Sequence, residues 1–181
     1  MPQIIELTDR SGLDYLHGLV ERAGNMQPVL KEIGVDMQES AIQRFSTTTA
    51  PDGTPWARNS AVTLLNYSQR FARNKNGTLK PDGVRAMGAK KPGTVEGTLA
   101  NHSISFQVKS ESEVSIGSSM PYAGTFHYGA QSGEFGMAGY KTRNGIFPIP
   151  WGNIPARPFL GASEDDKANI VRLVQSYLLE G

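Results

Sequence analysis

Three histidines and one acidic triplet are the side chains with which this sequence could carry out acid–base, nucleophilic or metal chemistry. His17, His102 and His127 share no spacing typical of metal ligands, so a metal site is not expected. His102 directly precedes Ser103, and neighbours on a strand point to opposite faces, so this histidine would not activate that hydroxyl. The acidic run at 164–166 lies where a helix is expected to begin, and the helix dipole explains it there. We therefore expect no catalytic residue, no metal and no cofactor.

His127 stands among the aromatic residues Tyr122, Phe126 and Tyr128. No G-x-S-x-G turn is present to expose a nucleophile for it. A hydrolase that uses His127 is therefore the weaker hypothesis. A histidine that makes a hydrogen bond in the core or at an interface is the favoured one.

The stretch from Gly83 to Lys90 approaches the pattern of a phosphate-binding loop. In that pattern the lysine directly follows the second glycine and precedes Ser or Thr, but here Ala89 intervenes and Lys91 and Pro92 follow. No strand before it and no helix after it are expected, so we predict no nucleotide site here.

The formal charge of +1 conceals a concentration of positive charge in the middle of the chain. Residues 61–110 contain 8 Lys or Arg and 2 Asp or Glu, whereas residues 1–60 contain 5 and 8, and residues 111–181 contain 5 and 7. The basic segment is therefore a candidate contact for an anionic partner. Its cations are Arg70, Arg73, Lys75, Lys80, Arg85, Lys90 and Lys91.

Between Phe71 and Phe106 there is no aromatic residue on which a base could stack. Any contact of the basic segment with nucleic acid would therefore be made to the phosphate backbone, without sequence preference. Two alternatives remain open: a solvated loop, and a contact with the acidic N-terminal helices of a neighbouring copy.

Two N-terminal helices are expected within about residues 10–46. The first runs from Ser11 to an interruption at Gly24, and the second covers about 26–45, although Gly34 weakens it by about 1 kcal/mol relative to Ala. Residues 60–73 are expected to form a short helix whose Val62, Leu65 and Phe71 face the core. The glycines of residues 74–96 predict a flexible loop.

The spacing of apolar residues then changes from helical to alternating. The alternation predicts a β-hairpin at about 101–117, followed by a short helix that contains Tyr122, Phe126 and His127 and ends at Gly129. A second Gly-rich loop is expected at 130–152, with its proline-rich end, 146–151, as an edge strand or extended arm. Ser163 is the expected N-cap of a final helix at about 163–180.

The composition excludes several classes of protein. Without cysteine, the chain has no disulfide framework and no thiolate chemistry. It also lacks a run of 18 apolar residues and the basic and apolar regions of a signal peptide. We therefore expect a soluble protein that begins in a cytoplasm and has no membrane partner.

Several short motifs, in this order, resemble those of the phage virion morphogenesis family, the tail completion proteins of Mu-like and related tailed phages. The similarity covers most of residues 26–180 and leaves 74–96 and 130–152 unmatched. The matching residues are Phe45 ahead of Pro51-x-Gly53-x-Pro55-Trp56, Gly97-Thr98-Leu99 with Ser103-Ile104, Ile116-Gly117 leading to Tyr122-Ala123 and His127-x-Gly129, and Ile154-Pro155-Ala156-Arg157-Pro158-Phe159-Leu160-Gly161.

This resemblance implies a single domain at 1–181 with an α+β fold, in which a small antiparallel sheet packs with N-terminal and C-terminal helices and carries long Gly-rich loops. It also implies a structural, non-catalytic protein of the neck or tail end that completes the tail and allows it to join the head. The expected partners are further copies in a ring, favoured as a hexamer, and neighbouring connector, tail terminator or tail tube proteins. The protein would assemble in the host cytoplasm and then belong to the virion. A DNA-contacting connector that uses residues 70–91 on the passing genome is the alternative.

Two groups of residues are predicted to contact another protomer or partner. In the first, Arg157 lies on a stiff proline-flanked segment that suits a bidentate contact with a carboxylate, and Phe159 could anchor it. The alternative for that segment is that it guides the chain into the last helix, with Phe159 in the core. The second group is Tyr122, Phe126 and His127. The complete set is Arg157, Pro158, Phe159, Tyr122, Phe126, His127 and Trp56. Trp56 also suits the edge of the core.

Overall fold

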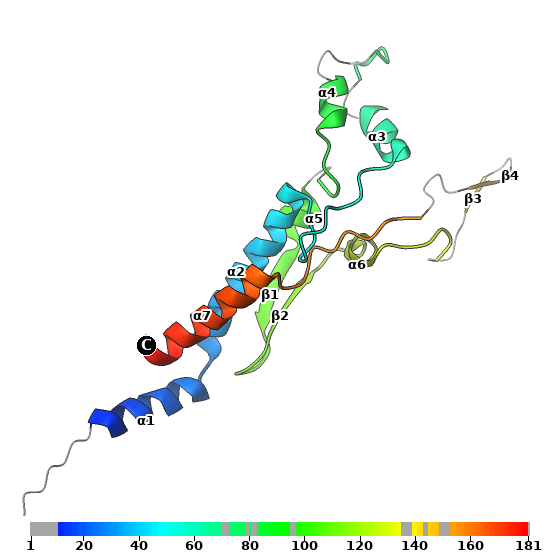
Figure 1. Cartoon of the computed structure of the whole chain (residues 1–181). Coiled ribbons are helices and arrows are strands. Elements are labelled where there is room, and N and C mark those ends of the chain that lie inside the picture. The colour runs from blue at the N-terminus through cyan, green and yellow to red at the C-terminus, as the bar shows by residue number, and fades with distance from the viewer. Residues whose placement is uncertain are drawn as a thin grey trace, which may run out of the picture.

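The computed structural model describes residues 11–69, 73–78, 80, 83–94, 97–134, 139–142, 145–148 and 153–180. Two long helices, α2 (Gln27–Thr47) and α7 (Glu164–Glu180), lie side by side and form the centre of an elongated molecule (Figure 1). A hairpin of β1 (Ile104–Val108) and β2 (Val114–Ser118) packs against α2. The fold is therefore α+β, with a small antiparallel sheet packed against helices, as the sequence resemblance implied.

The two N-terminal helices are confirmed. The first, α1 (Ser11–Gly24), contacts α7 and is joined to α2 by a two-residue connection. Pro28 stands in the first turn of α2, where its missing N–H costs no hydrogen bond, and Thr48 ends the helix in the left-handed conformation with φ 57°. The buried residues of α2 are Val29, Leu30, Ile33, Gly34, Ala41, Arg44 and Phe45.

The hairpin follows from the alternating apolar pattern. β1 and β2 pair antiparallel, with Phe106 opposite Ile116 and Val108 opposite Val114. The expected start at 101 is corrected, because residues up to 102 belong to a helix that the sequence did not reveal, α5 (Thr98–His102). His102 therefore ends a helix. The sequence argument had placed it on a strand, and that placement is wrong.

The core lies where α2, the hairpin, α6 (Ala123–Tyr128) and the segment before α7 converge. Phe45 is its centre, with its ring centroid 5.1 Å from that of Trp56, 5.7 Å from Phe126 and 5.3 Å from Phe159. Phe45 and Phe159 are fully buried, and edge-to-face and tilted ring pairs of this kind add to the burial energy. These rings fix α6 and the approach to α7 against the end of α2.

The short helix expected at 60–73 is shorter and faces differently. It is α3 (Ala61–Tyr67), and Ser60 caps it by accepting a hydrogen bond from the N–H of Thr63. Leu65 is half exposed and therefore does not face the core as predicted, whereas Val62 is partly buried. Phe71 lies outside the described residues.

Both regions predicted as loops contain regular structure. Helix α4 (Gly83–Gly88) lies within the expected loop at 74–96. A second hairpin, β3 (Gly139–Thr142) with β4 (Gly145–Pro148), lies within the expected loop at 130–152. Residues 149–151, part of the expected extended arm, lie outside the described residues.

Candidate interaction surfaces

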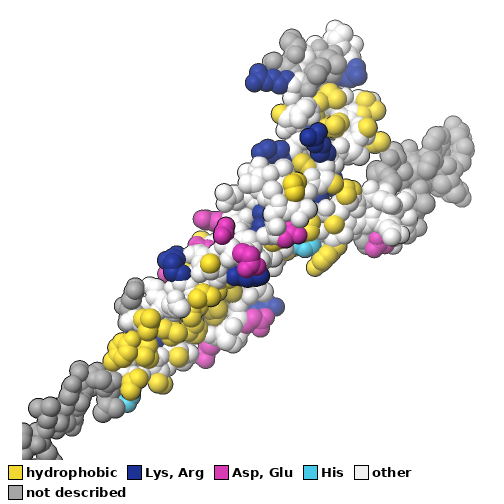
Figure 2. Space-filling view, viewed as in Figure 1, with side chains coloured by type: hydrophobic (Ala, Val, Ile, Leu, Met, Phe, Trp, Pro, Cys, Tyr) yellow, Lys and Arg dark blue, Asp and Glu magenta, His cyan; other side chains and the backbone are white. Residues whose placement is uncertain are grey.

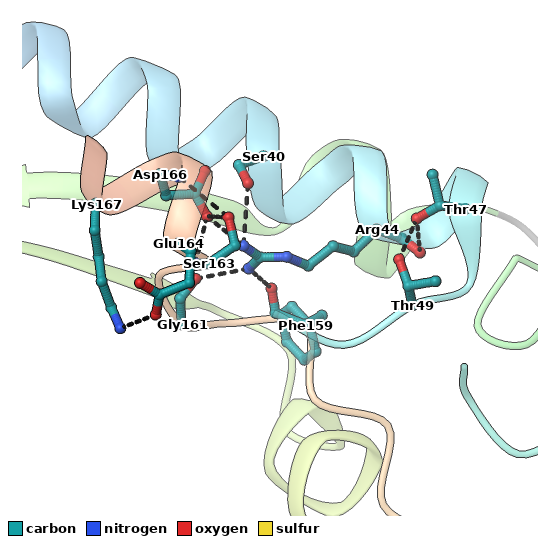
Figure 3. A network of polar contacts seen from close by, with 10 residues as sticks. All are labelled: Ser40, Arg44, Thr47, Thr49, Phe159, Gly161, Ser163, Glu164, Asp166 and Lys167. Atoms are coloured by element: carbon teal, nitrogen blue, oxygen red, sulfur yellow. Dashed lines mark hydrogen bonds and ion pairs between the residues drawn. The ribbon is translucent and has the colours of Figure 1, made fainter. Parts of the chain in front are cut away.

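A buried arginine joins α2 to the beginning of α7. Arg44 donates from Nη1 to the carbonyl oxygens of Phe159 and Gly161, at 2.9 and 2.8 Å, and from Nη2 to Asp166 Oδ2 at 2.6 Å (Figure 3). Its side chain is 7% exposed and that of Asp166 14%. The guanidinium therefore holds both the segment before α7 and the first turn of α7 in place.

Asp166 also closes the N-terminus of α7. Its Oδ2 accepts hydrogen bonds from the N–H and the hydroxyl of Ser163, both at 2.8 Å, and its own N–H donates to Ser163 Oγ at 3.1 Å. This reciprocal pattern is a capping box with Asp in place of Glu, so the predicted N-cap is confirmed. Burial alone would raise the pKa of Asp166, but the hydrogen bonds from Ser163 and Ser40 and the charge of Arg44 outweigh it and lower that pKa.

The structure buries two of the predicted interface residues, Phe159 and Trp56. Phe159 is 0% exposed, and Trp56 is buried and donates from its indole N–H to the carbonyl oxygen of Pro158 at 2.9 Å. The alternative interpretation, with Phe159 and Trp56 in the core, is therefore the one that the structure gives. Pro158 is partly buried.

Arg157 likewise has partners within the chain. It is 7% exposed, and it donates from Nε to the carbonyl oxygen of Ala57 at 2.9 Å and from Nη2 to that of Arg58 at 3.1 Å. Its guanidinium also lies over the ring of Phe126, 5.6 Å from the centroid. Burial lowers the pKa of Arg157. Within the protomer the guanidinium therefore contacts two backbone carbonyls of the segment before α3, and the contact with a partner's carboxylate stays a prediction.

His127 is positioned as a hydrogen-bond acceptor. The N–H groups of Phe159 and Leu160 point at its Nδ1, at 3.3 and 3.4 Å, and burial lowers its pKa. This geometry fits the favoured interpretation of a core hydrogen bond. Phe126 and His127 are partly buried, whereas Tyr122 is half exposed and Tyr128 is 81% exposed. The exposed tyrosines, Tyr122 and Tyr128, are named the tyrosine surface.

A second group of exposed apolar side chains lies on the outer helices. Val20 of α1 is 71% exposed, and further apolar residues of α1 and α7 are about half exposed. Figure 2 shows hydrophobic side chains gathered over α7 and α1, away from the region of α6. Helical spacing alone does not show whether such an apolar residue is buried, because it does not show which helix lies at the edge. This group is named the helical surface and comprises Tyr15, Leu16, Val20, Val171 and Leu179.

The positive charge of the middle segment lies on a projection that stands apart from α2 and α7 (Figure 1). We name residues 57–94 the basic arm. Of its predicted contact residues, Arg73, Lys75, Lys80 and Arg85 are exposed, and Arg70 lies outside the described residues. Lys90 and Lys91 lie at its base instead. The ammonium of Lys90 is 5.5 Å from the ring centroid of Tyr67, and that of Lys91 donates to the carbonyl oxygen of Ser46.

A groove of about 650 Å³ lies beside Arg44 between the end of α2, the turn at 50–53 and the start of α7. Among the described residues, no three His, Asp or Glu side chains are placed to share a metal ion. Gly83–Gly88, in the stretch that approached a phosphate-binding loop, forms α4 itself.

The described residues form an α+β fold with exposed apolar and basic surfaces around a rigid aromatic core. A family model, that of the phage virion morphogenesis family, matches residues 8–179, and the chain belongs to that family. The resemblance found in the short sequence motifs is thereby confirmed. Comparisons with curated protein sequences and with solved structures gave no significant match. Within the described part of the chain, no helix is both long enough and apolar enough to cross a bilayer.

Proposed function

We propose that this protein is a structural component of the phage neck or tail end, where it completes the tail and allows head joining as a homo-oligomeric ring. Membership of the phage virion morphogenesis family supports a role in building the virion. The observation that carries the ring is the presence of two groups of exposed apolar side chains on one protomer, the helical surface and the tyrosine surface. Contiguous exposed apolar side chains favour association.

Two different surfaces on one chain suit a head-to-tail contact between copies. In such a heterologous contact the helical surface of one copy meets the tyrosine surface of the next, and repetition of the same rotation closes a ring. The six-fold symmetry of tail tubes favours six copies. The aromatic core and the Arg44 contacts hold the two surfaces at a fixed separation, which ring closure requires.

The assembly role is tested in a phage whose copy of this gene carries an early stop codon. We expect infected cells to accumulate DNA-filled heads and separate tails, visible by negative-stain electron microscopy. Expression of the wild-type chain in the same cells should restore joined particles. Normal yields of joined virions without the protein would contradict the proposal.

A further inference from the structure

We infer that the basic arm is a contact surface for double-stranded DNA, which it binds through phosphates and without sequence preference. The inference concerns a ligand and does not depend on ring formation. Its cations Arg58, Arg73, Lys75 and Arg85 are exposed. Residues 57–94 contain 8 Lys or Arg and one acidic residue, Asp82, which lies outside the described residues. Figure 2 shows Lys and Arg side chains on this projection.

The base of the arm is held rigidly, so its cations are presented at a fixed place. Arg157 binds the carbonyl oxygens of Ala57 and Arg58 where the arm begins. Asn59 Nδ2 donates to the carbonyl oxygen of Lys90 at 2.9 Å, which joins the outgoing and returning chain. Gly93 marks the return, with φ +73°, and a Cβ there would lie 2.8 Å from the ring of Phe126. A pre-positioned base lowers the ordering cost of binding.

The distribution of the cations favours a polyanion over a single acidic group. Arg73 and Lys75 lie on the turn at 73–78, Arg85 lies on α4 and Arg58 lies before α3. Duplex DNA carries one charge about every 1.7 Å along its axis, so cations on several elements can each meet a phosphate. A single carboxylate on a partner would contact only one of these cations.

The aromatic residues of the arm indicate duplex rather than single-stranded nucleic acid. Binding of single strands relies on exposed rings that stack on unpaired bases. The ring of Tyr67, the aromatic residue of the arm that the structure describes, is covered by the ammonium of Lys90. The described arm therefore offers charge without a stacking platform.

Some acidic side chains that a neighbouring copy could offer to the arm are already engaged. Several already have partners within the chain: Asp166 with Arg44, Glu164 with Lys167, and Glu113 with Lys109. Asp36 accepts a hydrogen bond from Asn169, and Asp52 accepts one from the N–H of Thr54. Contact with the arm would compete with these interactions.

The test is fluorescence anisotropy of the full-length protein with a 30-base-pair duplex, repeated over a range of salt concentrations. We expect binding that weakens linearly in a plot of log K against log salt. The double variant K75Q/R85Q should lower affinity at least tenfold and reduce the magnitude of the slope by about 2. The matched control K31Q/K109Q removes two exposed cations from outside the arm and should change affinity less than twofold.

Three outcomes would overturn the inference. They are a salt slope indistinguishable from zero, an equal loss in the arm and control variants, and stronger binding to a single-stranded oligonucleotide of the same length. If the wild type does not bind DNA and K75Q/R85Q loses self-association, the arm contacts a neighbouring copy instead. If the purified protein binds DNA but heads and tails join normally in a phage that lacks it, only the proposed function is contradicted.

Discussion

Gly34 of α2 lies so close to the ring of Phe106 on β1 that a Cβ at position 34 would overlap it. The glycine that weakened the sequence prediction of α2 therefore has a packing role, since it lets the hairpin approach the helix. We predict that Gly34→Ala lowers the free energy of unfolding by about 1–2 kcal/mol. The clash with the hairpin should exceed the gain of about 1 kcal/mol in helix propensity.

The control for this substitution is Gly24→Ala, because nothing lies within 4 Å of a Cβ at the end of α1. Chemical denaturation should show Gly24→Ala to be neutral or slightly stabilising. Equal stabilisation by the two substitutions would show that the hairpin does not pack on Gly34 in solution.

The buried ion pair of Arg44 and Asp166 should matter far more than the exposed pair of Lys167 and Glu164. Arg44→Met leaves a buried carboxylate without its cation, and we expect a loss of about 3 kcal/mol in the free energy of unfolding. Lys167→Met should cost less than about 1 kcal/mol because its pair is solvated. Urea denaturation of both variants measures the difference. Similar small losses of unfolding free energy in the two variants would show that Arg44 does not link α2 to α7.

Protonation of His127 should weaken the fold in mild acid. Its Nδ1 accepts from two backbone N–H groups and burial lowers its pKa, so the unfolded chain binds a proton more readily than the folded chain. The contribution of His127 to stability is present above the ordinary histidine pKa of about 6.5 and is lost as the pH falls below it. Thermal melts between pH 7.5 and 5 measure this loss.

The matched variant for the histidine is His127→Asn, whose Oδ1 can accept hydrogen bonds near the position of Nδ1 but does not titrate. We expect the decline in melting temperature between pH 7.5 and 5 to be smaller in this variant. His17 and His102 remain in both proteins and serve as an internal control. An identical decline in wild type and variant would exclude His127 as its source.

Arg157 should act on the base of the arm rather than on a partner. Lysine keeps the charge but cannot present the same fork of N–H groups, so Arg157→Lys should loosen the contact with Ala57 and Arg58. We expect at least threefold faster hydrogen exchange in α3, with no change for the control Arg172→Lys. Unchanged exchange together with lost assembly would restore the predicted role of Arg157 at an interface.

The sequence predicted the elements whose signals are local. Helices α1 and α7 have apolar residues at helical spacing and turn or capping residues at an end, and the β1–β2 hairpin has strict alternation. Helices α4 and α5 have only six and five residues, too few for a periodic pattern, so they were missed. The glycines and prolines of 130–152 likewise concealed the β3–β4 hairpin.

The candidate surfaces could be predicted only in part, because contacts between distant segments decide which residues are buried. Arg157 binds carbonyl oxygens 100 and 99 positions earlier in the chain, and backbone carbonyls leave no mark in a sequence. The same holds for Trp56, whose partner is the carbonyl of Pro158. Exposed apolar residues such as Val20 are indistinguishable from core residues until the position of α1 is known.

Mass photometry of the purified protein, alone and mixed with tails from a phage that lacks it, tests the proposed ring most directly. We predict a defined oligomer, favoured as a hexamer, which is lost in L16D/V20D but kept in the control Leu65→Asp, an exposed apolar position outside both surfaces. Circular dichroism should confirm that both variants stay folded. A wild-type protein that remains monomeric even with tails, or equal loss of assembly in both variants, would contradict the account.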